Sequence, residues 1–225
     1  SRLGLHPRLI EPAMTLILHS AWRASAPYRV RIALNLKGLD YDYAPVDLAG
    51  GQQHSAAYRA LNPQGLTPAL EADGHVLTQS LAILEWLEET HPEPALLPKA
   101  PLERAAVRTM MGVIACDIHP VNNLRILQAL SKAGLDETVR TTWAQRWIND
   151  GFAVLEPMIA RHGQGFAFGA TPTLADCCLI PQVYSSARFK VDLAPYPHIA
   201  AVGARAAQHP AFQAAEPHKQ PDATP

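Results

Sequence analysis

A proline-rich segment at residues 91–104 divides the chain into two parts with different hydrophobic patterns. The first part alternates short β-rich runs with single helical segments, whereas the second part has helical periodicity throughout. This division predicts an α+β protein of two domains. We expect an N-terminal extension over 1–13, a first domain over 14–95, a linker over 96–104, an all-helical domain over 105–216 and an irregular tail over 217–225.

The first domain has the element order strand, helix, strand, hairpin, helix. Pro27 suits the first turn of a helix, where its missing N–H costs nothing, and Gly38 ends that helix. Asp73-Gly74 is a two-residue signal for a β-hairpin. The predicted elements are strands at 15–20 and 42–48, a helix between residue 25 and Gly38, a hairpin over 70–77 and a helix over 80–89.

The second domain consists of amphipathic segments. Thr173 and Asp176 have the spacing of a capping box, in which the two side chains close the start of a helix. The adjacent Cys177 and Cys178 are interpreted as buried, small apolar residues. We expect one continuous segment over 102–132, helices over 136–160 and from residue 173, core positions for Trp143 and Trp147, a short helix from residue 197 and irregular chain from His209.

Charge and composition exclude several classes of function. The chain has 19 basic and 20 acidic side chains, so it shows no electrostatic preference for nucleic acid or an anionic membrane. No apolar run is long enough for a transmembrane helix. The histidines show no paired metal-ligand spacing. We therefore expect no nucleic acid, membrane or metal partner.

The cysteines and the N-terminal residues indicate the cellular compartment of the protein. Cys116, Cys177 and Cys178 cannot all pair, which indicates a reducing compartment. Residues 1–13 contain two prolines and no signal-peptide core. We expect a cytoplasmic protein.

Six segments carry a family pattern, namely Trp22–Leu34 (WRASAPYRVRIAL), Gly50–Gln53, Ala60–Pro63, Gln79–Ile83, Pro181–Val183 and Arg188–Leu193. In this order they resemble the zeta class of cytosolic glutathione transferases, the maleylacetoacetate isomerase family, with bacterial maleylpyruvate isomerases as near relatives. The resemblance runs from Thr15 to Asp222. It implies a thioredoxin-like first domain, an all-helical second domain and glutathione as cofactor. It also implies a homodimer in which the first domain of one copy docks on the second domain of the other.

The resemblance further implies how glutathione is held. The backbone of Thr67, before a cis Pro68, pairs with the tripeptide in strand fashion. Ser80 and the N–H groups that follow it bind the γ-glutamyl carboxylate, as helix N-termini bind anions. From the residues alone, Ser80 can also be interpreted as a helix N-cap. The other implied contacts are Gln53, Gln79, His119, Asn123 and Arg125, of which His119 and Asn123 are four residues apart and are expected on one helix face.

The turn before the first helix departs from the family pattern. The zeta class carries serine, serine and cysteine where this chain has Ala24, Ser25 and Ala26. A thiol with a pKa near 8.5–9 is mostly protonated at neutral pH, so the glutathione thiolate needs stabilisation. Either Ser25 reaches the sulfur, or the helix N–H groups and Arg23 are sufficient, with Arg29 adding positive potential. Ser25 can also be interpreted as an N-cap.

The family substrate is a small acid of the cis-dienoate type with two carboxylates. Arginine binds carboxylates in bidentate fashion, and Arg23 and Arg188 correspond to family positions near the substrate. Without the resemblance, either could be an ordinary solvated arginine. Maleylpyruvate isomerases carry arginine where Leu124 stands, which favours maleylacetoacetate.

Three functions are consistent with these residues. The first, which we expect, is a glutathione-dependent cis–trans isomerase that converts maleylacetoacetate to fumarylacetoacetate in aromatic amino acid catabolism, by thiolate addition, bond rotation and elimination. The second is a maleylpyruvate isomerase or a transferase acting on small α-halo acids. The third is a non-catalytic protein that binds glutathione or a partner, which Ala24 keeps open.

Overall fold

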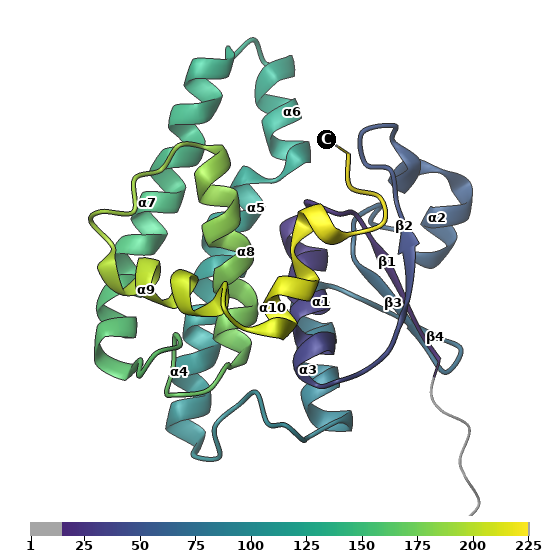
Figure 1. Ribbon diagram of the computed structural model, residues 1–225. Coiled ribbons are helices and arrows are strands. Elements are labelled where there is room, and N and C mark those ends of the chain that lie inside the picture. The colour runs from purple at the N-terminus through teal and green to yellow at the C-terminus, as the bar shows by residue number, and fades with distance from the viewer. Residues whose placement is uncertain (1–14, 225) are drawn as a thin grey trace, which may run out of the picture.

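The computed structural model describes residues 15–224 as two packed domains (Figure 1). The expected extension over 1–13 lies outside these residues. Within the described range, no helix combines the length and the apolar character that a bilayer span requires.

A four-stranded mixed sheet with the order β2-β1-β3-β4 forms the first domain. β1 (Leu16–Ser20) is parallel to β2 (Asp42–Pro45) and antiparallel to β3 (Ala69–Ala72), which pairs in turn with β4 (His75–Thr78). The helices are α1 (Ser25–Leu36), a 3-10 turn (Gln52–His54), α2 (Ala56–Leu61) and α3 (Ser80–Thr90). This arrangement confirms the predicted thioredoxin-like domain.

The predicted hairpin is confirmed, whereas the second strand is shorter than predicted. Asp73 and Gly74 both have positive φ angles, 48° and 76°, as the favoured two-residue turn requires. β2 ends at Pro45 instead of residue 48. The chain leaves the sheet here because Asp47 starts a turn, in which its carboxylate accepts the Gly50 N–H at 2.9 Å.

The connection between β2 and β3 contains a helix that is absent from the predicted elements. Ser55 caps α2, since its hydroxyl accepts the Tyr58 N–H at 3.2 Å. At the end of this connection the Thr67–Pro68 peptide bond is cis, as the resemblance implies.

The second domain is all-helical. A capping box opens its central helix as predicted: Asp176 accepts the N–H groups of Thr173 at 2.8 Å and Ala167 at 2.7 Å. Cys177 and Cys178 follow and are fully buried. The elements are α4 (Pro101–Gly112), a π-helical turn (Val113–Ile118), α5 (His119–Asn122), α6 (Leu124–Lys132), α7 (Glu137–His162), α8 (Leu174–Arg188), α9 (Pro197–Ala206), α10 (Pro210–Ala215) and a 3-10 turn (Pro217–Lys219).

The continuous segment predicted over 102–132 is wrong, because the chain breaks twice. Pro120 has no N–H to bond the carbonyl four residues before it, and the helix widens into the π turn at this point. Asn123 is extended (φ −73°, ψ 165°), and its side chain accepts the Ile126 N–H at 3.1 Å to start a new helix.

Trp143 and Trp147 are half-buried, which corrects the prediction that they belong to the core. Their ring centroids lie 5.8 Å apart in an edge-to-face arrangement on α7. The Arg146 guanidinium lies over the Trp147 ring, 5.6 Å from the ring centroid.

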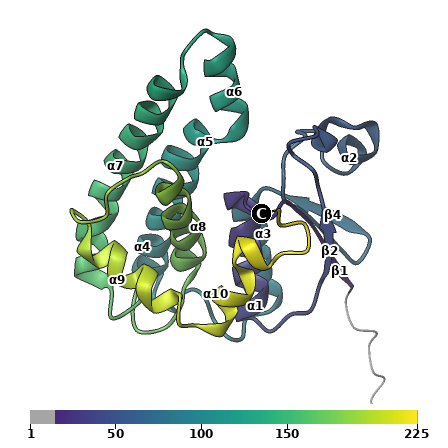
Figure 2. The same ribbon diagram turned by 45° about the horizontal axis from the view of Figure 1, so that its top comes forward.

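The irregular chain predicted from His209 is also wrong. The His209 side chain accepts the Ala211 N–H at 3.2 Å, and Pro210 occupies the first turn of α10. Pro217 similarly opens the 3-10 turn. After α10 the chain returns to α1 and β1 of the first domain, as both ribbon views show (Figures 1 and 2).

Helix α1 is buried on opposite faces. It lies between the sheet and α3 on one side and α8 and α10 on the other (Figure 1). Most of its 12 residues are buried, and these include two arginines, Arg29 and Arg31. Such a helix positions its first turn rigidly between the two domains.

Candidate active site

The turn from β1 into α1 carries the residues of the predicted thiolate site. Ala24 is extended (φ −74°, ψ 130°) and is the N-cap residue, so Ser25 is the first helical residue. The N-cap interpretation of Ser25 is therefore wrong. Ser25 is 9% exposed and lies at the start of α1, and its hydroxyl has no hydrogen-bond partner among residues 15–224.

The first turn of α1 also presents backbone donors. The first intrahelical bond runs from the Tyr28 N–H to the Ala24 carbonyl at 3.1 Å, and Pro27 has no N–H. The N–H groups of Ser25 and Ala26 therefore precede the helical ladder and lie at the positive end of the helix dipole. This end of the helix suits a thiolate.

Ser80 and Arg29 form a buried pair behind this turn. The Arg29 Nη1 donates to the Ser80 hydroxyl oxygen at 3.1 Å, and the two residues are 3% and 5% exposed. Ser80 is the first residue of α3, preceded by the N-cap residue Gln79, so the N-cap interpretation of Ser80 is wrong. Because its oxygen accepts from Arg29, the Ser80 proton is directed toward another acceptor.

The remaining first-domain residues lie around the same edge of the sheet. His19 of β1 is paired with Ala69, which places Thr67-Pro68 beside the end of β1. The Gln79 amide donates to Gln64 in the loop before β3 at 2.7 Å. Gln79 adopts an unusual positive φ of 66°, which turns its backbone toward this loop.

Gln53 is buried in the 3-10 turn after β2. Its amide nitrogen donates to the Leu48 carbonyl at 3.4 Å, while its buried amide oxygen has no partner among residues 15–224. A buried amide oxygen without a donor is unfavourable unless a ligand supplies one. This geometry fits the expected contact to glutathione.

His119 of α5 lies near two cations. Burial, together with the nearby charges of Arg29 and Arg125, lowers the pKa of His119 to about 3, so the imidazole is neutral. The second domain thus brings His119 and Arg125 toward the Arg29–Ser80 pair of the first domain.

Asn123 does not share a helix face with His119, contrary to the prediction, because α5 ends before it and its side chain caps α6. Its neighbour Asn122 is buried, and both polar atoms of its amide lack partners within residues 15–224. Sequence reasoning missed Asn122. The only sequence feature that could have pointed to Asn122 is the adjacent pair Asn122-Asn123, and the pair alone does not indicate which asparagine caps α6.

Arg23 and Arg188 are brought together from different domains. Partial desolvation lowers the pKa of Arg188, and the nearby Arg23 cation lowers it further. Among residues 15–224, no carboxylate lies within salt-bridge distance of Arg23, Arg29, Arg125 or Arg188. Cations that repel each other without a counter-ion are stabilised by an anionic ligand.

The thiols and the buried carboxylate show no catalytic arrangement. Burial raises the pKa of Cys178 to about 11 and that of Cys177 well above its usual value, so both stay protonated. Burial also raises the pKa of Asp176 to about 6, and its oxygens are occupied by the capping box. No group of three or more potential metal ligands lies among the described residues.

Comparisons with known proteins identify the family of this chain. Residues 25–90 match the family model "Glutathione S-transferase, N-terminal domain". A maleylpyruvate isomerase of Ralstonia sp is 49% identical over 209 residues, with 91% of this chain and 98% of the relative covered. A maleylacetoacetate isomerase of Pseudomonas aeruginosa is 48% identical over 208 residues, with 91% and 97% covered.

Solved structures lead to the same group. A holo maleylpyruvate isomerase, a zeta-class bacterial glutathione transferase, has a TM-score of 0.91 at 48% identity, with 92% of this chain and all of that chain covered. A maleylacetoacetate isomerase from Anaeromyxobacter dehalogenans with glutathione in its active site has a TM-score of 0.86 at 45% identity, with 94% and 99% covered. The chain therefore belongs to the zeta class of cytosolic glutathione transferases, the maleylacetoacetate isomerase family.

Proposed function

We propose that the protein is a glutathione-dependent cis–trans isomerase that converts maleylacetoacetate to fumarylacetoacetate. The observation that carries the proposal is the pair of arginines, Arg23 and Arg188, which are close enough for the charge of Arg23 to lower the pKa of Arg188 and which have no carboxylate within salt-bridge distance among residues 15–224. Two such cations suit the two carboxylates of a small diacid. The N-terminus of α1, with its free Ser25 hydroxyl, lies next to them to stabilise a thiolate.

Glutathione can supply hydrogen-bond partners to polar groups that have none among residues 15–224, such as the Gln53 amide oxygen. In this proposal Ser80 donates its proton to the γ-glutamyl carboxylate, and the α3 N–H groups and Gln79 complete that anion site. The Thr67 backbone pairs with the cysteinyl part, and Gln53 contacts the other end of the tripeptide. His119, Asn123 and Arg125 line the side that the second domain contributes. Of these, Asn123 contributes less than the resemblance implies, since its side chain already caps α6.

Bound glutathione supplies a thiolate that adds to the substrate double bond, which rotates as a single bond before the thiolate leaves again. The residues of this chain stabilise the negative charges of the glutathione thiolate and of the substrate. The N–H groups of Ser25 and Ala26, the Ser25 hydroxyl and the Arg23 cation favour the ionised sulfur. Arg23 and Arg188 hold the substrate carboxylates and stabilise the negative charge that moves onto the substrate during addition.

An absorbance assay with maleylacetoacetate, with and without glutathione, tests this function. Isomerisation that requires glutathione without consuming it supports the proposal. Stoichiometric consumption of glutathione with an α-halo acid, and no isomerisation, supports a conjugating or dehalogenating transferase. Glutathione binding with neither reaction supports a non-catalytic protein.

The choice between maleylacetoacetate and maleylpyruvate depends on position 124. Leu124 is the first residue of α6 and is 41% exposed, so the chain has no cation there. Replacing it with arginine, Leu124→Arg, should raise kcat/KM for maleylpyruvate relative to maleylacetoacetate by about tenfold, the effect of one added charged contact. A ratio that does not change would mean that position 124 does not select the substrate.

We also propose that the protein is a cytoplasmic homodimer. Leu102 on α4 is 87% exposed and Val76 on β4 is 37% exposed, which places apolar side chains on both domains where docking between copies would cover them. The free state of Cys116, Cys177 and Cys178 suits a reducing compartment. Light scattering should give twice the chain mass of 24.4 kDa, and a monomer mass would contradict the dimer.

A further inference from the structure

The segment after α10 makes direct contact with the active-site turn. Asp222 uses both carboxylate oxygens: one accepts the Trp22 backbone N–H at 3.0 Å, and the other accepts the Tyr43 hydroxyl at 2.6 Å. Trp22 immediately precedes Arg23. A carboxylate thus holds the peptide group next to a residue that we place against the substrate.

The same turn is held from its other side by Arg31. The Arg31 Nη2 donates to the Trp22 carbonyl at 2.7 Å, and its Nη1 donates to the Ser20 hydroxyl at 3.0 Å. The Arg31 Nε donates to the Ala215 carbonyl at the end of α10, at 3.1 Å. The N–H and the carbonyl of Trp22 are therefore both bound by charged side chains, the N–H by Asp222 of the C-terminal segment and the carbonyl by Arg31, which also binds the last residue of α10.

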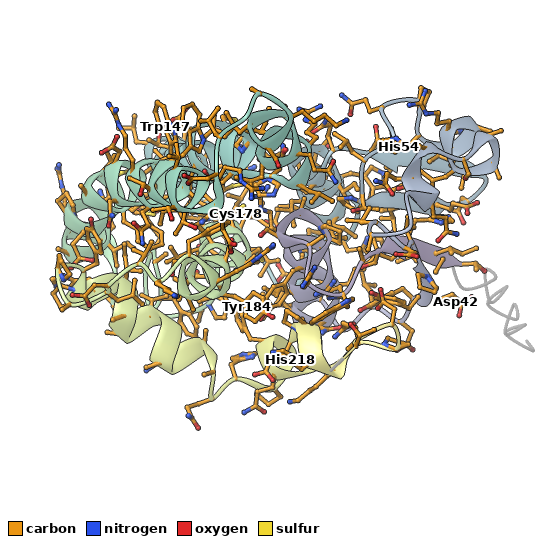
Figure 3. The ribbon with its side chains drawn as sticks, turned by 90° about the horizontal axis from the view of Figure 1, so that it is seen from above. Asp42, His54, Trp147, Cys178, Tyr184 and His218 are labelled. Carbon is orange, nitrogen blue, oxygen red and sulfur yellow. The ribbon has the colours of Figure 1, made fainter. Side chains whose placement is uncertain are left out.

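The segment also reaches the helix that carries Arg188. His218 lies 3.5 Å from the Tyr184 hydroxyl, and Figure 3 shows the two side chains where α8 faces the C-terminal segment. Tyr184 is one helical turn before Arg188 and so shares its side of α8. The His218 ring also lies near the Trp22 ring, with centroids 5.7 Å apart.

Asp222 is itself held in place. Gln220 is buried, and its amide nitrogen donates to the carbonyls of Ala214 at 3.0 Å and Glu216 at 2.8 Å. These bonds fold the segment back onto α10. The segment that carries Asp222 is therefore tied to α10, while the Asp222 carboxylate itself binds Trp22 and Tyr43 of the first domain.

We propose that residues 216–224 form a positioning element for the substrate site, in which Asp222 fixes the Trp22 backbone and so sets the position of Arg23 relative to Arg188. This inference rests on the proposed function of the two arginines. Asp222 and Tyr43 act through Trp22 and are positioning residues. Displacements of about 1 Å at a reacting site can reduce rates by about a hundredfold, so loss of this contact should lower turnover.

Asp222→Ala tests the inference, with Thr224→Ala as a matched control, because Thr224 is exposed two residues away and makes no side-chain hydrogen bond within the described chain. We expect kcat/KM for maleylacetoacetate to fall by about tenfold in Asp222→Ala, while KM for glutathione changes by less than about twofold. Thr224→Ala should behave as the wild type. Asp222→Asn, which keeps one acceptor oxygen, should restore part of the loss.

A double-mutant comparison distinguishes positioning from a general loss of structure. In an Arg23→Ala background, Asp222→Ala should cause little further loss, because Arg23 is the group that it positions. An undiminished tenfold loss in that background, or kcat/KM within twofold of the wild type for the single variant, would overturn the inference.

Hydrogen exchange of the Trp22 amide gives a readout that does not depend on activity. Exchange should accelerate in Asp222→Ala and stay unchanged in Thr224→Ala, with the melting temperature measured alongside. Slow exchange in Asp222→Ala would overturn the inference whatever the kinetics. If the wild-type protein fails to isomerise maleylacetoacetate but exchange still accelerates in Asp222→Ala, the proposed function is contradicted and the anchoring of the turn stands.

Discussion

Arg29 and Arg31 are two residues apart on α1 and equally buried, yet their surroundings differ completely. Arg31 donates from all three guanidinium nitrogens, to the Ser20 hydroxyl and to the carbonyls of Trp22 and Ala215. Arg29 donates only to Ser80, and its Nε has no partner among residues 15–224. Two residues on a helix are about 200° apart, so the arginines face different neighbours.

We infer from this difference that hydrogen-bond satisfaction, and not burial, separates a structural cation from a ligand-facing one. Burial lowers the pKa of both guanidinium groups. For Arg31 the surrounding carbonyls, the hydroxyl and the more distant Asp222 charge compensate for the lost hydration. For Arg29 the compensation is incomplete within the chain, as expected for a group that completes its bonds with a ligand.

The largest expected effect is on stability, from Arg31→Met. The substitution leaves the Trp22 and Ala215 carbonyls without their donor. Hydrogen bonds to a charged group contribute about 1.5–3 kcal/mol each and are not additive, so the free energy of unfolding should fall by about 3–5 kcal/mol. Denaturant unfolding at fixed protein concentration measures this, and a change below about 1 kcal/mol would contradict a structural role.

Arg29→Met is the substitution matched to Arg31→Met. It should weaken glutathione binding and leave the stability of the protein nearly unchanged. Removing an unpaired buried charge should leave the free energy of unfolding within about 1 kcal/mol of the wild type. Glutathione binding should weaken by about 10–100-fold, because Ser80 loses the donor that directs its proton and the anion site loses a cation. Calorimetry with glutathione measures the affinity, and Arg29→Lys should recover part of it. A large loss of stability with normal affinity would make Arg29 a second structural arginine.

Arg188→Ala extends the comparison to the substrate. Among residues 15–224, Arg188 has neither a carboxylate partner nor the set of carbonyls that surrounds Arg31, so it is expected to belong to the ligand-facing class. Loss of one charge-assisted contact should lower kcat/KM for maleylacetoacetate by about 10–100-fold, with KM for glutathione unchanged. Unchanged kinetics for both compounds would mean that Arg188 is an ordinary surface residue.

The sequence predicts those parts of the fold that depend on local chemistry. The turn at Asp73-Gly74 and the capping box at Thr173 follow from residue types that few other conformations accommodate. Pro210 and Pro217 mislead because proline is typical of both irregular chain and the first turn of a helix. The break between α5 and α6 is equally ambiguous, since either asparagine of the pair can cap a helix.

The candidate site was predictable only where a family pattern covers it. The pattern indicates that Arg23, Ser80 and Arg188 belong together, but no local signal assigns different roles to Arg29 and Arg31. Those roles depend on Ala215, nearly 200 residues away, and on Ser80, which lies in another helix. Contacts at such separations are created by packing and are not encoded in any short segment.

The smallest expected effect compares two serines on either side of the active-site turn. The Ser20 hydroxyl is fully buried and accepts from Arg31, whereas the Ser25 hydroxyl has no partner within residues 15–224. Ser25→Ala should therefore leave the melting temperature unchanged, since Ala24 and not Ser25 occupies the N-cap position. Ser20→Ala is the matched control and should lower the melting temperature.

If the Ser25 hydroxyl donates to the glutathione sulfur, its removal should raise the pKa of the bound thiol. The loss of about 1–2 kcal/mol of thiolate stabilisation corresponds to roughly tenfold slower turnover at neutral pH. Because the ionised fraction of a thiol with a raised pKa increases with pH, part of the rate should return as the pH rises. Full activity of Ser25→Ala with an unshifted pH profile would assign thiolate stabilisation to the Ser25 and Ala26 N–H groups and Arg23 alone. Ala24→Ser, which restores the family serine, should then raise turnover only if a hydroxyl at this turn is what the sulfur lacks.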